Sequence, residues 1–321
     1  MQAIQISATG GPDVLAWTTV DDPRPGPDDV VVRLAAAGVN YIDTYHRSGL
    51  YPLALPFTPG VEGAGEVVAV GANAGGMAVG DRVAWAQAPG SYAELVRVPA
   101  VVAVAVPDGV GLDVAAAAML QGLTAHYLVH DTFPLQSGQR CLIHAGAGGV
   151  GLLLIQLAKR LGAEVFTTVG SLDKVELVKA AGADHVIRYR DEDFGTAVEA
   201  IAGTRALDVV YDGVGQAVFE RSLTLLRRRG YMVTFGNASG PVDPIAPLRL
   251  MQGSLFLTRP TMGDYLASRD ELERRARDLF TWIAAGELGI RIGERVPLAD
   301  AAEAHRRLEG RATTGKVLLV P

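Results

Sequence analysis

The 321-residue chain contains a single cysteine, Cys141, and no long apolar stretch. One cysteine excludes an intramolecular disulfide, and its place in a predicted buried strand indicates a small apolar side chain in a reducing compartment. We find no run that approaches the roughly 18 apolar residues needed to span a bilayer. The start of the chain, Met1 to Ile6, lacks the basic region and cleavage site of a signal peptide. These absences predict a cytoplasmic protein with no membrane partner.

Lysine is also scarce, since the 29 basic residues are four lysines and 25 arginines. The formal net charge is -6 and the sequence pI is about 5.6, so the chain lacks the basic footprint that nucleic acids or anionic membranes require. Its one basic run, Arg227 to Arg229, is short and suits a solvated helix end, where cations complement the helix dipole. Nucleic acid is therefore not expected as a partner.

The pattern along the chain changes twice, and the length favours two domains. Residues 1–121 hold short β-type runs separated by Gly and Pro, which predict a mostly antiparallel β domain. From 122 to 258, strands alternate with helices, with strands expected at 140–145, 164–169, 184–188, 207–212, 231–235 and 254–257. This alternation predicts an α/β fold, a Rossmann-like doubly wound parallel sheet. The tail, 259–321, has a charged helix at 269–285 and a last strand at 316–320, which we expect to return to the first domain.

A glycine-rich turn follows the first strand of this alternating region. Gly146, Gly148 and Gly151 satisfy the Gly-x-Gly-x-x-Gly spacing, directly after the apolar run 141–144 and directly before the amphipathic stretch 152–161. Such glycines allow a tight turn and close approach of the backbone to a pyrophosphate, whose charge meets the free amides of the helix N-terminus. A purely structural turn is the alternative. Because ligands bind beyond the carboxyl ends of parallel strands, the active site is expected in the cleft between the two domains.

The residues after the second strand indicate which dinucleotide is bound. A binder of NAD usually carries an acidic residue there for the ribose hydroxyls. This chain instead has Gly170, Ser171 and Lys174, with Tyr189 at the end of the third strand, and these supply donors and positive charge for a 2′-phosphate. NADPH is therefore favoured as the cofactor, although Asp173 is close enough in sequence to serve a ribose instead.

Several further motifs, in order along essentially the whole chain, resemble the zinc-free quinone oxidoreductases of the medium-chain dehydrogenase/reductase superfamily. They lie at 37–45, 47–51, 59–67, 79–83, 121–125, 210–215, 235–237 and 258–260. The resemblance implies a GroES-like β domain at 1–121 and 259–321, into which the NADPH-binding Rossmann domain at 122–258 is inserted. It also implies a quinone acceptor and a homodimer paired along the sheet of the cofactor domain.

The resemblance further implies site residues. Asn40 and Tyr45 would lie near the nicotinamide and the acceptor, with Tyr51 a candidate wall of the acceptor site or an ordinary loop residue. The pyrophosphate would meet Gly148, Gly149 and Val150, and the 2′-phosphoribose would meet Gly170, Ser171, Lys174 and Tyr189. The remaining residues implied for the nicotinamide half are Gln121, Thr124, Phe235, Gly236, Asn237, Arg259 and Lys316.

No metal is expected. Where zinc-dependent relatives have a thiolate and a histidine, this chain has Asn40 and Val61, and one cysteine cannot build a four-cysteine zinc site. His126 and His130 are spaced for one helix face but lack a third ligand. Without a Lewis acid, the acceptor should be intrinsically electrophilic, which suits direct hydride transfer from nicotinamide C4 to a quinone.

Tyr45 is left with two roles, proton donation or packing against the nicotinamide. Two other functions also stay open: reduction of enones or alkenals, and NADPH binding without catalysis in a structural or RNA-associated protein.

Overall fold

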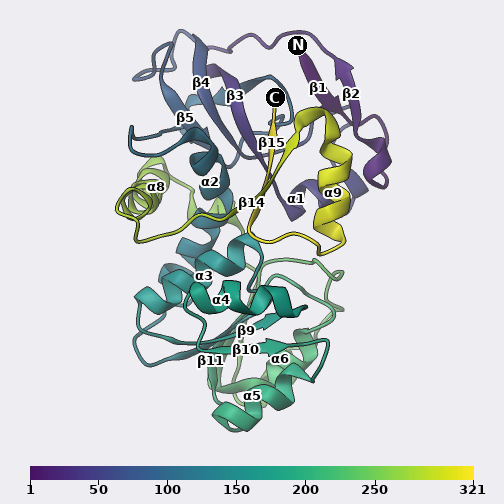
Figure 1. Ribbon diagram of the computed structural model, residues 1–321, viewed down its shortest axis with the longest axis vertical. Coiled ribbons are helices and arrows are strands. Elements are labelled where there is room, and N and C mark those ends of the chain that lie inside the picture. The colour runs from purple at the N-terminus through teal and green to yellow at the C-terminus, as the bar shows by residue number, and fades with distance from the viewer. The chain divides into compact units, whose positions relative to one another are not determined.

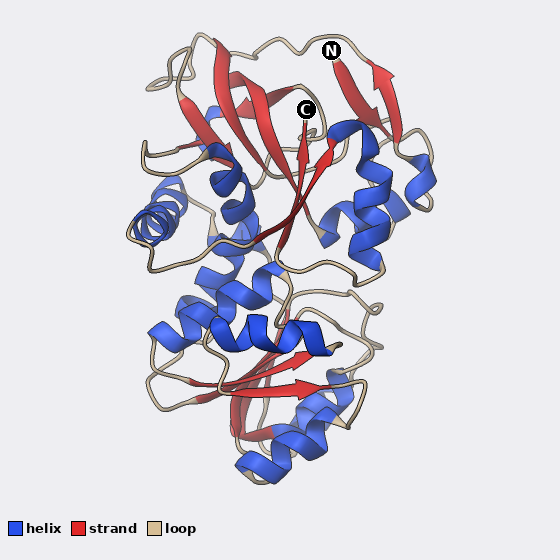
Figure 2. Ribbon diagram, viewed as in Figure 1, coloured by secondary structure: helices blue, strands red, loops and turns tan.

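Each part of the chain builds its own sheet. In the computed structural model, which describes all residues from Met1 to Pro321, unit 1 comprises Met1–Leu123 and Leu266–Pro321, and unit 2 comprises Thr124–Tyr265. Figure 2 shows the strands of each unit gathered together and flanked by helices. The segment 259–265, which the sequence assigned to the first domain, stays with unit 2. There Tyr265, at the end of α7 (Met262–Tyr265), stacks on Tyr127 with ring centroids 4.4 Å apart.

The main sheet of unit 1 has seven strands in the order β14-β15-β3-β4-β5-β7, with β6 also paired to β3. Their bounds are β3 Asp29–Val39, β4 Gly63–Val70, β5 Arg82–Trp85, β6 Leu95–Pro99, β7 Val104–Ala105, β14 Ile292–Pro297 and β15 Lys316–Val320. All pairs are antiparallel except β14 with β15. A small second sheet joins β1 (Gln2–Gln5) to β2 (Ala16–Thr19).

The last strand returns to the first part of the chain, as the sequence predicts. Leu318 of β15 lies opposite Gly38 of β3, and its neighbours Val317 and Leu319 belong to a core that also contains Trp85. Four helices belong wholly or partly to this unit: α1 Tyr41–Ser48, α2 Leu112–Tyr127, α8 Arg269–Ala284 and α9 Ala301–Glu309. Figure 1 shows α9 beside β14 and β15. Helix α8 begins at a capping box, because the Ser268 hydroxyl accepts from the Glu271 amide at 3.3 Å.

One helical stretch is more apolar than the sequence predicts for any part of the chain. Leu112–Thr132, formed by α2 and the π-helical segment Leu128–Thr132 that follows it, is long and apolar enough to cross a membrane by length and composition. However, 78% of its apolar window is buried inside the protein. A buried core helix meets the same criterion, so the stretch is weak support for a membrane span.

Unit 2 is a six-stranded, wholly parallel sheet in the order β10-β9-β8-β11-β12-β13. Its strands are β8 Arg140–Ile143, β9 Glu164–Val169, β10 His185–Arg188, β11 Leu207–Asp212, β12 Leu226–Thr234 and β13 Phe256–Thr258. The order is the 3-2-1-4-5-6 arrangement of a Rossmann fold, with its switch point between β8 and β11. The predicted fold class is therefore confirmed.

The helices of unit 2 cover both faces of this sheet. They are α3 Gly149–Arg160, α4 Val175–Ala180, α5 Phe194–Ala202 and α6 Phe219–Leu225. In Figure 1, α3 and α4 lie on one side of the strands, and α5 and α6 lie on the other. The face of the sheet that α5 and α6 cover buries Leu142, Phe166 and Val210 of the strands against Phe194 of α5 and Phe219 of α6.

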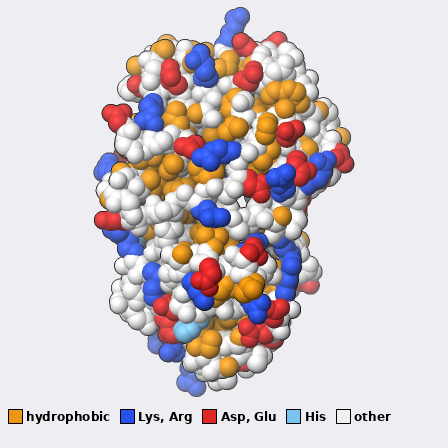
Figure 3. Space-filling view, in the orientation of Figure 1, with side chains coloured by type: hydrophobic (Ala, Val, Ile, Leu, Met, Phe, Trp, Pro, Cys, Tyr) orange, Lys and Arg blue, Asp and Glu red, His pale blue; other side chains and the backbone are white.

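One expectation about charge is wrong. The basic run Arg227 to Arg229 does not end a helix, because α6 stops at Leu225 and the three arginines form the start of β12. On the face drawn in Figure 3, acidic and basic side chains are interspersed over both units. No field of one sign develops on that face.

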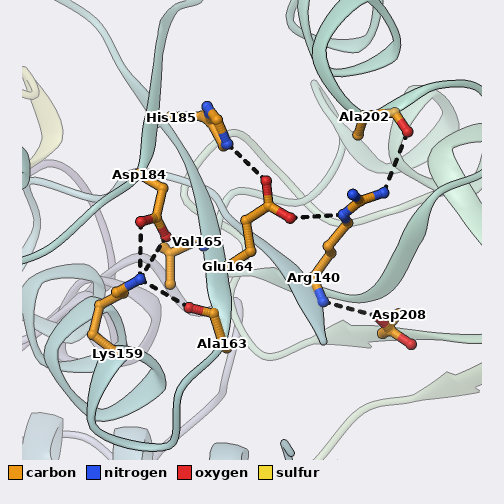
Figure 4. A network of polar contacts seen from close by, with 9 residues as sticks. All are labelled: Arg140, Lys159, Ala163, Glu164, Val165, Asp184, His185, Ala202 and Asp208. Atoms are coloured by element: carbon orange, nitrogen blue, oxygen red, sulfur yellow. Dashed lines mark hydrogen bonds and ion pairs between the residues drawn. The ribbon is translucent and has the colours of Figure 1, made fainter. Parts of the chain in front are cut away.

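The amino ends of the parallel strands are held by a polar network (Figure 4). Arg140, which begins β8, donates to Glu164, which begins β9, at 2.7 Å, and His185 of β10 meets the other oxygen of Glu164 at 2.8 Å. Lys159 of α3 binds Asp184 at 2.8 Å, just before β10. These pairs fix the amino edge of the sheet, so the carboxyl edge is the one available for a ligand.

Candidate active site

The glycine turn lies at the carboxyl end of β8, next to the switch point of the sheet. Ala145 opens it with a positive φ of 53°. A Cβ on Gly151 would lie 2.5 Å from the Ala145 carbonyl oxygen, and one on Gly146 would overlap the Thr167 hydroxyl. Glycine is therefore required at both positions for the loop to close tightly on the strand.

Helix α3 begins directly on this turn and presents its first amides without a side-chain cap. Gly148 occupies the N-cap position in extended conformation and makes no side-chain cap hydrogen bond. The first amides of an α-helix, here those of Gly149, Val150 and Gly151, have no partner within the helix. Their dipoles favour an anion at this point. The turn therefore fits the pyrophosphate of a dinucleotide, by its shape and by its donors.

The residues predicted to read a 2′-phosphate gather at the ends of the next two strands. Gly170 follows β9, and a Cβ there would lie 2.7 Å from the hydroxyl of Tyr189, which follows β10. Ser171 caps the short turn Leu172–Lys174, so Ser171 and Lys174 lie within one turn of each other. Asp173, the competing acid, is fully exposed, and a hydrogen bond from Ser171 lowers its pKa. The cluster offers hydroxyl groups and an ammonium group beside a single carboxylate.

The ends of β11 and β12 bring together the unit 2 residues predicted for the nicotinamide half. The carbonyl oxygen of Asp212 accepts from the Phe235 amide at 2.7 Å, and Arg259 donates to the carbonyl oxygen of Gly236 at 3.1 Å. With its amide oriented so that both ends are paired, Asn237 donates to the same Gly236 oxygen and accepts from Arg259. Thr124, also in this unit, is buried on α2.

Asp212 was missed by sequence reasoning. One carboxylate oxygen accepts from the amides of Val214 and Gly215 at 2.7 and 2.9 Å, while the other is buried without a partner. Burial raises the pKa of Asp212 to about 6. An acidic residue that ends a buried strand just before two glycines was the available signal.

In unit 1, Asn40 lies within a closed set of polar contacts. Its amide nitrogen donates to Glu62 at 2.8 Å and to the carbonyl oxygen of Gly38 at 3.2 Å, and its amide oxygen accepts from Lys316 at 2.8 Å. Both amide hydrogens are therefore occupied within the protein. The Asn40 side chain therefore links Gly38, Glu62 and Lys316.

Lys316 and Glu62 form a buried ion pair around Asn40. Lys316, the first residue of β15, is 1% exposed, Glu62 is fully buried, and the ammonium contacts one carboxylate oxygen directly. The other oxygen of Glu62 accepts from the Leu120 amide at 2.6 Å. Gly38 makes room for the pair, since a Cβ there would overlap both side chains. The sequence predicts Lys316 as a site residue but not Glu62, although Glu62 lies within the motif at 59–67.

Tyr45 and Tyr51 form an aromatic pair on and after α1. Their ring centroids are 5.3 Å apart at 71°, and the Tyr51 amide donates to the Tyr45 carbonyl oxygen at 3.1 Å. Tyr45 is almost buried, whereas Tyr51 is 37% exposed and has the exposed side chains of Leu50 and Leu53 as chain neighbours. This segment presents an apolar, aromatic surface. Gln121, buried on α2, completes the residues predicted from unit 1.

No three His, Cys, Asp or Glu side chains in the structure form a group that could hold a metal ion. Val61 offers no ligand atom, and Asn40 is engaged by Glu62 and Lys316. His126 and His130 have ring centroids 4.5 Å apart on neighbouring turns and are joined by no third ligand. The side chains around Asn40 therefore form no ligand set for a metal ion.

Comparisons with known proteins agree with this architecture. The family model described as alcohol dehydrogenase GroES-like domain matches residues 26–108, and the model described as zinc-binding dehydrogenase matches residues 149–282. The chain is 46% identical to a quinone oxidoreductase of Pseudomonas aeruginosa, with 99% of each chain covered. It is 39% identical to a 2-haloacrylate reductase of Burkholderia, with 100% of this chain and 99% of the relative covered.

A solved structure, that of Escherichia coli quinone oxidoreductase complexed with NADPH, matches with a TM-score of 0.98 at 41% identity, over 100% of both chains. The resemblance inferred from the motifs is thereby confirmed. The chain belongs to the quinone oxidoreductases of the medium-chain dehydrogenase/reductase superfamily.

Proposed function

We propose that this protein is an NADPH-dependent quinone oxidoreductase, with unit 2 binding the cofactor and unit 1 contributing to the acceptor site. The observation that carries the proposal is the uncapped glycine turn beside the Gly170, Ser171, Lys174 and Tyr189 cluster. The turn fits a pyrophosphate, and the cluster fits a 2′-phosphate. The E. coli relative crystallised with NADPH shares this fold, which supports the assignment.

When bound, NADPH would supply a hydride from its nicotinamide ring to the acceptor. The α3 amides would bind the pyrophosphate, and Phe235, Gly236, Asn237 and Arg259 would line the nicotinamide half. Asn40 and Lys316 would hold the start of α1 and the start of β15 in place within unit 1. Tyr45 would either pack against the ring or donate a hydrogen bond to the developing oxyanion. Because Asn40 and Val61 supply no metal ligand set, the acceptor must already be electrophilic, which a quinone is.

The proposal is tested by following the near-ultraviolet absorbance of NADPH with 1,4-benzoquinone and with 9,10-phenanthrenequinone. Enzyme-dependent oxidation is expected with both, after subtraction of the reaction without protein. The absence of enzyme-dependent oxidation with any quinone would refute the assignment. Tight NADPH binding without turnover would favour a binding protein instead.

The Burkholderia relative, named for 2-haloacrylate reduction, favours a second candidate, an enone or alkenal reductase. Both candidates share the hydride donor and differ in the acceptor. Parallel assays with 2-chloroacrylate and a quinone separate them, because faster turnover of the α,β-unsaturated acid would reverse the ranking.

We further propose a homodimer joined through the β13 edge of the unit 2 sheet. Strand β13 ends the sheet, and Phe256 on it is 48% exposed and stacks on Tyr231 at 4.5 Å. Leu248 and Met251, shortly before this strand, are exposed as well. A second copy would pair the open edge and cover these apolar side chains. Sedimentation velocity is expected to give the mass of a dimer, and cell fractionation is expected to place the protein in the cytoplasm.

A further inference from the structure

A one-way chain of buried hydrogen bonds ends on Asp43. Arg47 contacts His305 Nδ1 at 3.0 Å, His305 Nε2 contacts the Tyr92 hydroxyl at 3.1 Å, and Tyr92 contacts Asp43 Oδ2 at 3.0 Å. A guanidinium can only donate, so Nδ1 of His305 must accept. Burial lowers the pKa of His305 to about 3, so its single proton is on Nε2. Tyr92 therefore accepts from His305 and gives its own hydrogen to Asp43.

Asp43 receives hydrogen bonds on one oxygen only. Oδ2 accepts from the Tyr92 hydroxyl and also from the backbone amide of Asn40 at 2.8 Å, while Oδ1 is buried without a partner. Because Oδ2 has two donors already, Oδ1 is the atom that can carry a proton. Burial raises the pKa of this carboxyl to about 7, against the opposing effect of its hydrogen bonds. Its charge therefore changes near neutral pH.

The groups around Asp43 leave its negative charge uncompensated. They are Lys316 from β15, Glu62 just before β4, Tyr92 just before β6, Arg47 on α1, His305 on α9 and Glu309 at the end of α9. Lys316 is paired with Glu62, and Arg47 is paired with Glu309 through two hydrogen bonds. Each cation thus has its own carboxylate, and ionised Asp43 adds a net negative charge to the cluster.

Asp43 also determines where α1 begins. It is the third residue of the helix, and with Asn40 it forms a capping box. Asp43 accepts from the backbone amide of Asn40. It therefore orients the Asn40 side chain, which bridges Glu62 and Lys316. Tyr45 lies on the same helix, two residues after Asp43.

We propose that Asp43 is a positioning residue for the acceptor site and a proton switch, which supports quinone reduction when Oδ1 carries a proton and slows it when the proton is lost. This inference rests on the proposed function. Reduction of a quinone creates negative charge on the acceptor, and an uncompensated carboxylate behind Asn40 opposes that charge. The effect acts on the transition state, so it should appear in kcat rather than in KM.

The first test needs no turnover. Asp43→Asn keeps a side-chain oxygen that accepts from the Tyr92 hydroxyl and the backbone amide of Asn40. It replaces Oδ1 by a neutral NH2 group, so it mimics the protonated acid. A carboxyl whose pKa is raised on folding makes the wild type less stable as pH rises from about 4 to 7. The urea midpoint of the wild type should fall between pH 5 and 8, whereas that of Asp43→Asn should fall less. The exposed Asp21→Asn should behave as wild type, and identical profiles for wild type and Asp43→Asn would overturn the proposal.

The second test is the pH profile of kcat with 1,4-benzoquinone at saturating NADPH. The wild-type kcat should fall on the order of tenfold as pH rises from 6 to 8. Asp43→Asn should keep the low-pH value throughout. Tyr92→Phe removes a donor to the carboxylate and should move the inflection to higher pH by about one unit. The same inflection in Asp43→Asn as in the wild type would overturn the switch.

The two tests separate the two proposals. If the wild type oxidises no NADPH with any quinone, the proposed function fails, and the urea profiles still report whether Asp43 takes up a proton. If quinones are reduced but Asp43→Asn leaves both profiles unchanged, the function stands and the role of Asp43 is refuted.

Discussion

Replacing Lys316 by Met tests whether the buried ion pair around Asn40 holds unit 1 together. The substitution keeps most of the side-chain volume and removes the ammonium group. The Glu62 carboxylate then stays fully buried, with only the side-chain amide of Asn40 and the backbone amide of Leu120 as donors. Breaking a buried pair at one partner costs about 3–5 kcal/mol. At roughly 2–4 °C per kcal/mol for a protein of this size, the melting temperature should fall on the order of 10 °C.

The chain supplies a matched control, because Lys179 pairs with Glu176 on the exposed surface of α4 at 3.0 Å. Lys179→Met should cost less than about 1 kcal/mol. Adding Glu62→Gln to Lys316→Met removes the stranded charge and should recover part of the loss. The loss in Lys316→Met should also be smaller at pH 5 than at pH 8, because the stranded carboxylate can take up a proton. Equal melting temperatures for the Lys316 and Lys179 variants would refute the reasoning.

Four further outcomes are expected. Lys174→Ala should raise the Kd for NADPH about 10- to 100-fold and leave the Kd for NADH nearly unchanged in titrations of the intrinsic fluorescence, whereas equal losses would contradict the 2′-phosphate assignment. Gly151→Ala should weaken NADPH binding at least about tenfold in the same titration, because its Cβ would lie 2.5 Å from a carbonyl oxygen. Phe256→Lys should yield a monomer in sedimentation velocity, and an unchanged dimer would exclude the β13 interface. Asp212→Asn should flatten the fall of the urea midpoint between pH 4 and 6, because the raised pKa of Asp212 makes the wild type lose stability over that range.

The sequence predicts the fold of unit 2 well because the alternation of strands and helices is local. Every strand of the sheet contains apolar residues and lies between turn residues, so its existence and direction follow from the chain order. The boundaries are harder, since they depend on contacts between distant residues. Arg227 to Arg229 belong to β12 between two points where this strand pairs with β11, Leu226 opposite Leu207 and Tyr231 opposite Val209. No local property of three arginines indicates a strand.

The candidate site divides in the same way. The glycine turn is a local motif, so the sequence is sufficient to predict it. Glu62 and Lys316 are 254 positions apart, and their pairing arises only because β15 returns to β3. A separation of 213 positions likewise hides the contact of Tyr92 with His305. Long-range polar pairs of this kind carry no spacing that a sequence pattern could reveal.

Each of the two units contains one buried carboxylate oxygen without a hydrogen-bond partner. Only three buried side-chain oxygens or nitrogens lack a hydrogen-bond partner, and two of them are carboxylate oxygens, Asp43 Oδ1 and Asp212 Oδ2. In each acid, the other oxygen accepts from backbone amides: that of Asn40 at the start of α1 for Asp43, and those of Val214 and Gly215 in the turn after β11 for Asp212. Each carboxylate uses one oxygen to fix a backbone turn, and the burial that this requires leaves the other oxygen without a hydrogen-bond partner. The fixed turn is thus obtained together with a raised pKa, and both acids gain their charge between about pH 6 and 7. Alkaline pH should therefore weaken each unit at the same segments that the proposed reaction needs to be rigid.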